Sequence, residues 1–208
     1  FSCGSWYSNA RGDATMLQSF AMYLTDTLYR HCPLSPQKRP IFQYGFEIMT
    51  STLCSAFSIL LISVFLRDIL SACLFLGIFF FLRLFAGGYH APTYAQCFIL
   101  TNSVYLVVYL VSRVFIAFQS TIPAIVLTLL SGLIIFTFSP IRNKKHPISE
   151  MVYRKNRDIA RILVTLEVLV LTSLILLRCD FTYTSVPIVS LAAVAVMMII
   201  PKLQERSE

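Results

Sequence analysis

The sequence predicts an all-α fold, a polytopic membrane helix bundle of about six transmembrane helices with an N-terminal amphipathic helix. Of the 208 residues, 57% are hydrophobic and only 13% are charged, which is too apolar for an ordinary soluble domain. The apolar residues come in runs of about twenty, the length that an α-helix needs to cross a hydrocarbon core of ~30 Å. No linker separates these runs into two groups, so we expect a single integral-membrane domain over residues 1–208.

The first helix is expected over residues 13–31, with Asp13 as its N-cap. Gln18 and Asp26 lie away from its apolar face, whose residues recur at helical spacing: Met16, Leu17, Phe20, Leu24 and Leu28. Such a helix is too polar to span a bilayer. We expect it to lie at the membrane interface or to pack on the bundle.

A six-span bundle is expected over residues 41–201. A tight turn at Arg67-Asp68 separates the first two spans, and residues 181–185 are expected to form a short turn before the last one. The expected spans cover residues 41–66, 69–85, 98–118, 122–138, 159–177 and 186–200.

The distribution of lysine and arginine predicts the orientation of the bundle. With six spans, 14 of the 17 basic residues fall on the side that holds both termini, the segment 83–97 and the polar segment that follows residue 138. Because cytoplasmic loops are enriched in Lys and Arg, we expect this side to face the cytoplasm. The net charge of +7 therefore reports membrane orientation, and no nucleic-acid partner is expected.

The segment 83–97 is the candidate functional site, since it is a short polar interruption between two apolar runs. His90 and Cys97 lie near each other in sequence, at the place where two spans meet. A histidine beside a cysteine is the minimal arrangement for a thiol nucleophile, in which imidazole accepts the thiol proton. Gly87 and Gly88 permit a sharp turn, and Pro92 suits the first position of the next helix. Spacing alone also fits a pair of packing residues.

The residues Arg83, Gly88, His90-Ala91-Pro92 and Cys97 closely resemble the motif of the accessory gene regulator B family (AgrB). The element Tyr-Gly-Phe-Glu at 44–47 and the proline- and lysine-containing loop at 139–147 are similar to further features of that family. The resemblance runs from about residue 13 to the end of the chain and is most specific at 83–97.

This resemblance implies a membrane cysteine endopeptidase of quorum sensing, with His90 and Cys97 as its catalytic residues. Its substrate would be a short propeptide of the AgrD type. The enzyme would remove the acidic C-terminal tail through an acyl-enzyme thioester and pass the acyl group on within the peptide, giving a cyclic thiolactone or lactone. Arg83, Gly88 and Glu47 would support the site or bind substrate, with Glu47 orienting His90. The resemblance also implies a homodimer.

We expect neither a cofactor nor a metal, because His31, His90 and His146 are too scattered in sequence to suggest zinc. Glu167 is an unexplained charge within the fifth span, for which pairing with Arg83 or Arg161 is the expected role. Two other functions remain open, a small transporter or channel and a different membrane acyltransferase. A transporter should tolerate loss of Cys97, and the chain shows none of the inverted repeats typical of that class.

Overall fold

The structure, a computed structural model, describes residues 16–32, 35–87, 93–141 and 150–207. These residues form seven α-helices and one short 3₁₀ helix, and no strand occurs among them, which confirms the all-α class. Six of the helices are long and apolar enough to cross a membrane. The α-helices are α1 Met16–His31, α2 Arg39–Phe65, α3 Ile69–Ala86, α4 Tyr94–Phe118, α5 Thr121–Phe138, α6 Glu150–Leu176 and α7 Phe181–Ser207.

The chain divides into two compact units, Phe1–Phe57 and Ser58–Glu208, and the boundary falls inside α2. In the first unit, contacts join the end of α1 to the segment that leads into α2. Tyr29 donates a hydrogen bond of 3.0 Å to the carbonyl of Ser35, and its ring meets that of Phe42 edge-on at 6.2 Å. Asp26 forms an ion pair with Arg39. The predicted helix over residues 13–31 is described from Met16 onward, and Asp13 lies outside the described residues.

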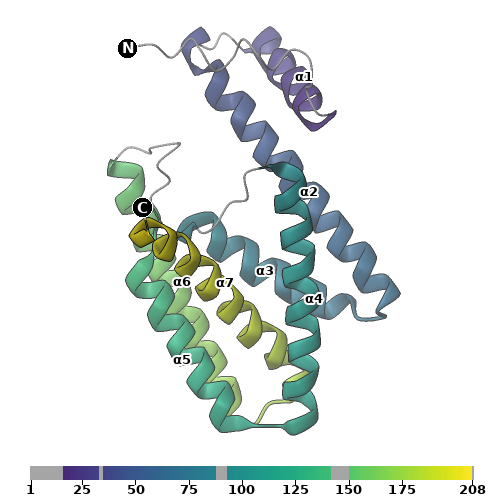
Figure 1. The fold of residues 1–208 in the computed structure, drawn as a ribbon, viewed down its shortest axis with the longest axis vertical. Coiled ribbons are helices and arrows are strands. Elements are labelled where there is room, and N and C mark those ends of the chain that lie inside the picture. The colour runs from purple at the N-terminus through teal and green to yellow at the C-terminus, as the bar shows by residue number, and fades with distance from the viewer. Residues whose placement is uncertain (1–15, 33–34, 88–92, 142–149, 208) are drawn as a thin grey trace. The chain divides into compact units, whose positions relative to one another are not determined.

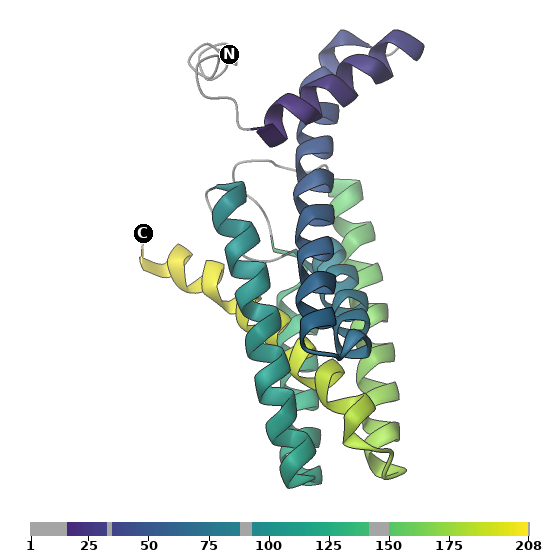
Figure 2. The same ribbon diagram turned by 90° about the vertical axis from the view of Figure 1, so that its right-hand side faces the viewer.

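The second unit is built around α7. In the most apolar 18-residue stretch of α7, 67% of the residues are buried, against 33% in the corresponding stretch of α3. The two helices nevertheless have similar hydropathy. Helix α7 packs against α3, α4 and α5, while α6 packs against α5 and α3. Figure 1 shows α7 between α4 on one side and the α5–α6 pair on the other, and Figure 2 shows it running obliquely to both.

Small side chains let the backbone of α7 approach its neighbours closely. Ser185 and Ser190 are fully buried, and Ala195 is nearly so. In a bilayer, where lipid tails are as apolar as leucine, helices associate mainly through close packing of small residues of this kind. The composition of α7 therefore suits a helix that contacts protein on most of its surface.

An aromatic cluster fills the space between α3 and α4. The rings of Phe75 and Phe79 stack with centroids 4.8 Å apart, and Tyr105 packs on Phe75 at 5.3 Å. All three residues are completely buried. At the far end of these helices, Arg113 on α4 forms an ion pair of 2.6 Å with Asp68, which also caps α3 by accepting a hydrogen bond from the Ser71 N–H.

Three helix starts differ from the sequence-based expectations, because helices extend beyond the apolar runs. Helix α4 begins at Tyr94, not at Pro92 or residue 98, since the Thr93 side chain accepts the Gln96 N–H at 3.2 Å. Helix α6 begins at Glu150 and includes polar residues that were expected to precede it. The expected turn at 181–185 is wrong: it is the first turn of α7, capped by Asp180, whose carboxylate accepts the Thr182 N–H at 2.8 Å. The turn at Arg67-Asp68 is confirmed.

Candidate active site

Cys97 lies at the start of the second turn of α4, in a backbone position that the helix fixes. Its N–H donates to the carbonyl of Thr93 at 3.0 Å, and its carbonyl accepts the Thr101 hydroxyl at 2.8 Å. The Cys97 residue is half-buried, and its sulfur forms no disulfide. The helix thus holds the Cys97 thiol at a fixed point one turn from the N-terminus of α4.

Arg83 occupies the last turn of α3, close enough to Cys97 for the guanidinium and the thiol to interact electrostatically. The side chain is half-buried between α3 and α7. Its Nη1 atom donates to the sulfur of Met197 on α7 at 3.4 Å, and its guanidinium carbon lies 5.4 Å from the centroid of the Phe79 ring. Contacts from two helices therefore hold a cation beside the candidate nucleophile.

The end of α3 is joined to the end of α5. The N–H of Ile141 donates to the carbonyl of Ala86 at 3.1 Å. Gly87, with φ of 76°, ends α3, and a Cβ atom at this position would meet the carbonyl oxygen of Ile141 at 3.4 Å. A positive φ and a close backbone neighbour together explain why glycine follows Ala86.

The structure brings together only part of the expected site. Arg83 and Cys97 are near each other, whereas Gly88 and His90 lie outside the described residues, as does Pro92. Glu47 belongs to the first unit, where its Oε1 accepts a hydrogen bond of 3.2 Å from Gln43 one turn earlier on α2. Its expected role toward His90 thus remains a prediction.

The structure narrows the choice of oxyanion donors around Cys97. The N–H of Gly87 donates to the carbonyl of Arg83 at 3.0 Å, and the N–H of Gln96 donates to the Thr93 side chain. Both groups are therefore engaged within their own helix ends. The N–H groups of Gly87 and Gln96 are thus not free to act as oxyanion donors in this structure.

Sequence reasoning did not identify Met197 or Ile141 as parts of this region, nor Thr93 as the cap of α4. The cap was detectable, since a threonine three residues before Gln96 matches the capping box. Met197 and Ile141 are far from the 83–97 segment in sequence and have no local signal. Only the packing of α7 on α3 and the hydrogen bond to Ala86 reveal them.

Glu167 has a different environment from the one expected. The structure shows no ion pair between Glu167 and Arg83 or Arg161, and Glu167 Oε2 is buried with no hydrogen-bond partner among the described residues. The guanidinium of Arg161 instead lies over the ring of Phe136, 4.9 Å from its centroid. The expected pairing is thus not formed.

A half-buried guanidinium beside a thiol favours chemistry that develops negative charge. It can attract a carboxylate or carbonyl oxygen of a bound peptide, and it can stabilise the oxyanion that forms when sulfur attacks a carbonyl. The arrangement therefore suits attack by sulfur on a carbonyl carbon at one end of a membrane helix bundle.

Comparison with known proteins agrees with the motif. The sequence model of the family described as accessory gene regulator B matches residues 21–201, which is most of the chain. No curated protein and no solved structure matches the chain. The matched region contains the whole 83–97 segment and all six candidate spans up to the end of the apolar part of α7. The chain therefore belongs to the accessory gene regulator B family, and its role is in the processing of quorum-sensing propeptides at the membrane.

Proposed function

We propose that the protein is a cysteine endopeptidase that removes the C-terminal tail of an AgrD-type propeptide, with Cys97 as nucleophile and His90 as general base. The observation that carries this proposal is the match of the family model over residues 21–201, which includes the 83–97 motif. The fold supports it, because Arg83 in the last turn of α3 and Cys97 in α4 are near enough to interact electrostatically, although they are 14 positions apart in the chain.

The proposed reaction begins with transfer of the Cys97 thiol proton to the imidazole of His90. The thiolate attacks the carbonyl carbon of the scissile peptide bond, and Arg83 stabilises the charge that develops. When the C–N bond breaks, the imidazolium returns its proton to the leaving amine, and the acyl group remains on sulfur as a thioester. Gly88 would give the peptide room to approach the backbone, and Glu47 would orient His90.

The second half of the reaction passes the acyl group to a thiol or hydroxyl of the same peptide. That group loses its proton to His90 and attacks the thioester carbonyl, which releases the Cys97 thiolate and closes a thiolactone or lactone ring. Exchange between thioesters changes the free energy little, so the activated carbonyl is conserved only if water is excluded. A site at the end of a helix bundle in the membrane favours such exclusion.

We place both termini, the 83–97 segment and the loop at 142–149 in the cytoplasm. The excess of Lys and Arg on this side supports the orientation. The hydrogen bond between Ile141 and Ala86 supports a functional link as well, because Arg142 follows Ile141 directly in the chain. The basic loop thus begins beside the end of α3, where Lys144 and Lys145 would attract an acidic peptide tail. The homodimer implied by the family stays a prediction.

The decisive experiment is to incubate the full-length protein, purified and reconstituted in lipid nanodiscs, with a synthetic AgrD-type propeptide. Intact-protein mass spectrometry should show an acyl adduct that maps to Cys97. The adduct should be absent in Cys97→Ala and should form much more slowly in His90→Ala. Cys73→Ala is a matched control, because Cys73 is an exposed cysteine on α3.

Processing that survives Cys97→Ala would overturn the assignment of the nucleophile. It would leave the cysteine as a packing residue and favour a transporter or an acyltransferase that uses other groups. Reversal of Lys144 and Lys145 to Glu tests the recruitment of the tail separately. We expect it to raise KM at low salt without abolishing the adduct, and an unchanged KM would refute recruitment by this loop.

A further inference from the structure

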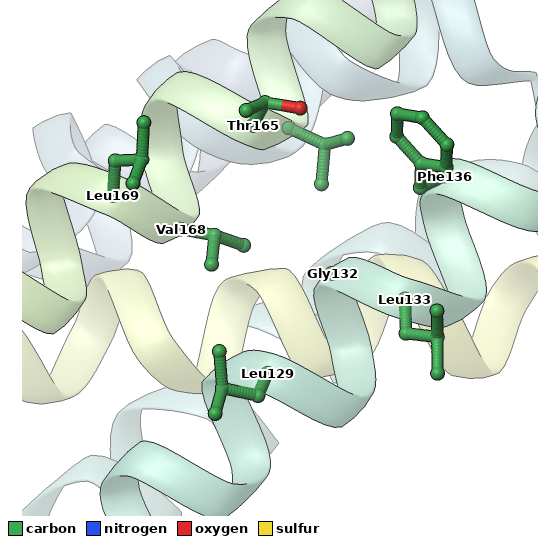
Figure 3. A pocket seen from close by; sticks show the side chains of 8 residues that line it. Leu129, Gly132, Leu133, Phe136, Thr165, Val168 and Leu169 are labelled. Atoms are coloured by element: carbon green, nitrogen blue, oxygen red, sulfur yellow. The ribbon is translucent and has the colours of Figure 1, made fainter.

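A groove between α5 and α6 has the features of a lipid site. It is an open depression of about 280 Å³, lined almost entirely by apolar side chains. Figure 3 shows Leu129 and Leu169 toward one end of this groove, with Phe136 and Thr165 nearer the other. The lining residues are Leu129, Gly132, Leu133, Phe136, Val164, Thr165, Val168 and Leu169.

The groove follows from one close helix contact. A Cβ atom on Gly132 would lie only 2.4 Å from Cγ2 of Val168, so only glycine allows α5 and α6 to approach here. On the outer side of this contact the larger side chains are exposed, Leu133 by 60% and Leu169 by 59%. Both helices are apolar enough to span a membrane, and in a bilayer these side chains would face hydrocarbon.

Two cations lie beyond one end of the groove, on α6. Arg161 lies over Phe136, which lines the groove, with 4.9 Å between the guanidinium carbon and the ring centroid. Arg157 precedes it by one helical turn, so the two side chains share a face of α6 with Thr165. The Nε atom of each arginine is buried and makes no hydrogen bond among the described residues. The ion pair between Arg157 Nε and Asp158 is long, 3.6 Å.

We propose that this groove binds one anionic phospholipid, with its phosphate on Arg157 and Arg161 and an acyl chain between Leu129 and Leu169. The two arginines match the charge of the phosphate, and the groove matches the apolar acyl chain. Arginine is the side chain best suited to bind phosphate through two donors, and here the arginines lie beyond one end of the apolar groove. From Arg161 to Leu169 the helix rises ~12 Å, which is enough to hold a large part of an acyl chain.

This occupant accounts for both halves of the site. A free phosphate ion would use the arginines and leave the groove unexplained. A neutral lipid would fill the groove and leave Arg161 without an anion and Arg157 with only the long contact to Asp158. A second copy of the protein would cover the leucines but would need to place a carboxylate over the arginines at the same time.

The test uses the full-length protein in detergent and native mass spectrometry with dioleoylphosphatidylglycerol or dioleoylphosphatidylcholine. We expect the wild-type protein to retain the anionic lipid at least fivefold more than the zwitterionic one. The double variant Arg157→Gln/Arg161→Gln should lose this preference. Arg154→Gln/Lys155→Gln removes the same charge from two exposed positions of the same helix and should keep the preference within twofold.

Leu133→Trp tests the acyl-chain half of the site. Leu133 is largely exposed, so the larger ring fills the groove without disturbing the core, and retention of the anionic lipid should fall although both arginines remain. Thermal unfolding of each variant in detergent verifies that it is folded. Lipid retention that is equal in all variants would overturn the proposal. So would full competition by inorganic phosphate, or a Leu133→Trp variant that retains the anionic lipid as the wild-type protein does.

Discussion

The N–H of Ile141 donates a hydrogen bond of 3.1 Å to the carbonyl oxygen of Ala86, and this bond holds the end of α5 against the end of α3. The contact fixes the point from which the segment containing His90 begins. It also fixes the point from which the basic loop begins. Changes at this junction should therefore affect catalysis even though neither residue takes part in the chemistry.

Gly87→Ala should impair both stability and processing. The backbone at Gly87 has φ of 76° and ψ of −156°, a region that is almost exclusive to glycine and costs other residues about 1–3 kcal/mol. Propeptide cleavage in nanodiscs and thermal unfolding measure the two effects. Gly77→Ala on the same helix is the control, because a Cβ there meets nothing within 4 Å and alanine favours helix. If Gly87→Ala and Gly77→Ala had the same cleavage rate and unfolding temperature, the backbone at Gly87 would have no role in stability or processing.

Arg83→Gln should slow the processing reaction, because the site loses the cation that would bind the peptide oxygens and the charge developing on the carbonyl. Arg83→Lys keeps the charge but not the planar guanidinium, so it should restore processing only in part. Initial rates of propeptide cleavage in nanodiscs measure both effects, and a rate for Arg83→Gln equal to that of wild type would show that Arg83 does not act in the reaction.

Gly132→Ala should destabilise the contact of α5 with α6 by about 1–3 kcal/mol, as expected for overpacking. The added methyl would lie 2.4 Å from Cγ2 of Val168. The second change Val168→Ala removes the clashing group, so the double variant should recover a good part of the loss in a thermal unfolding experiment. Additive losses in the double variant would contradict this account.

Asp68→Ala should destabilise the protein more than Arg113→Gln does. Asp68 caps α3 through the Ser71 N–H at 3.1 Å, accepts the Ser71 hydroxyl at 2.6 Å and pairs with Arg113, so alanine removes three interactions. A helix cap contributes ~1 kcal/mol and a partly exposed ion pair ~0.2–1 kcal/mol. Asp68→Asn retains a capping oxygen and should resemble Arg113→Gln. Equal unfolding temperatures for Asp68→Ala and Arg113→Gln would refute the capping role.

The cap of α7 should respond to acid. The backbone N–H and then the hydroxyl of Thr182, each 2.8 Å from Oδ1, lower the pKa of Asp180 below its ordinary value of 3.8. A lowered pKa in the folded state means that the ionised carboxylate stabilises the fold above pH ~3.8, and that this is lost as the pH falls through the lower value. The unfolding temperature of wild type should exceed that of Asp180→Asn at pH 6, and the two should converge at strongly acidic pH. A difference independent of pH would contradict this.

Local patterns in the sequence were sufficient to predict the membrane spans and to single out Cys97 as the candidate nucleophile. An apolar run of about twenty residues has one stable solution in a bilayer, a helix that satisfies its own backbone hydrogen bonds. The six expected spans therefore correspond to α2 through α7. The Arg83-to-Cys97 motif likewise led to the family that the comparison shows. Errors fell at helix starts such as Phe181, where a polar cap extended the helix beyond its apolar run.

Which helix forms the centre was decided only by the tertiary structure. Hydropathy is 2.1 for α7 and 2.4 for α3, yet α7 is the helix that the others surround. The physical reason is that lipid and protein interior are equally apolar, so hydrophobicity does not tell a buried face from one that contacts lipid. The same holds for Arg83: the sequence marked it as a charge at the end of a span, and the packing of α3 on α7 placed it against Met197 and beside Cys97.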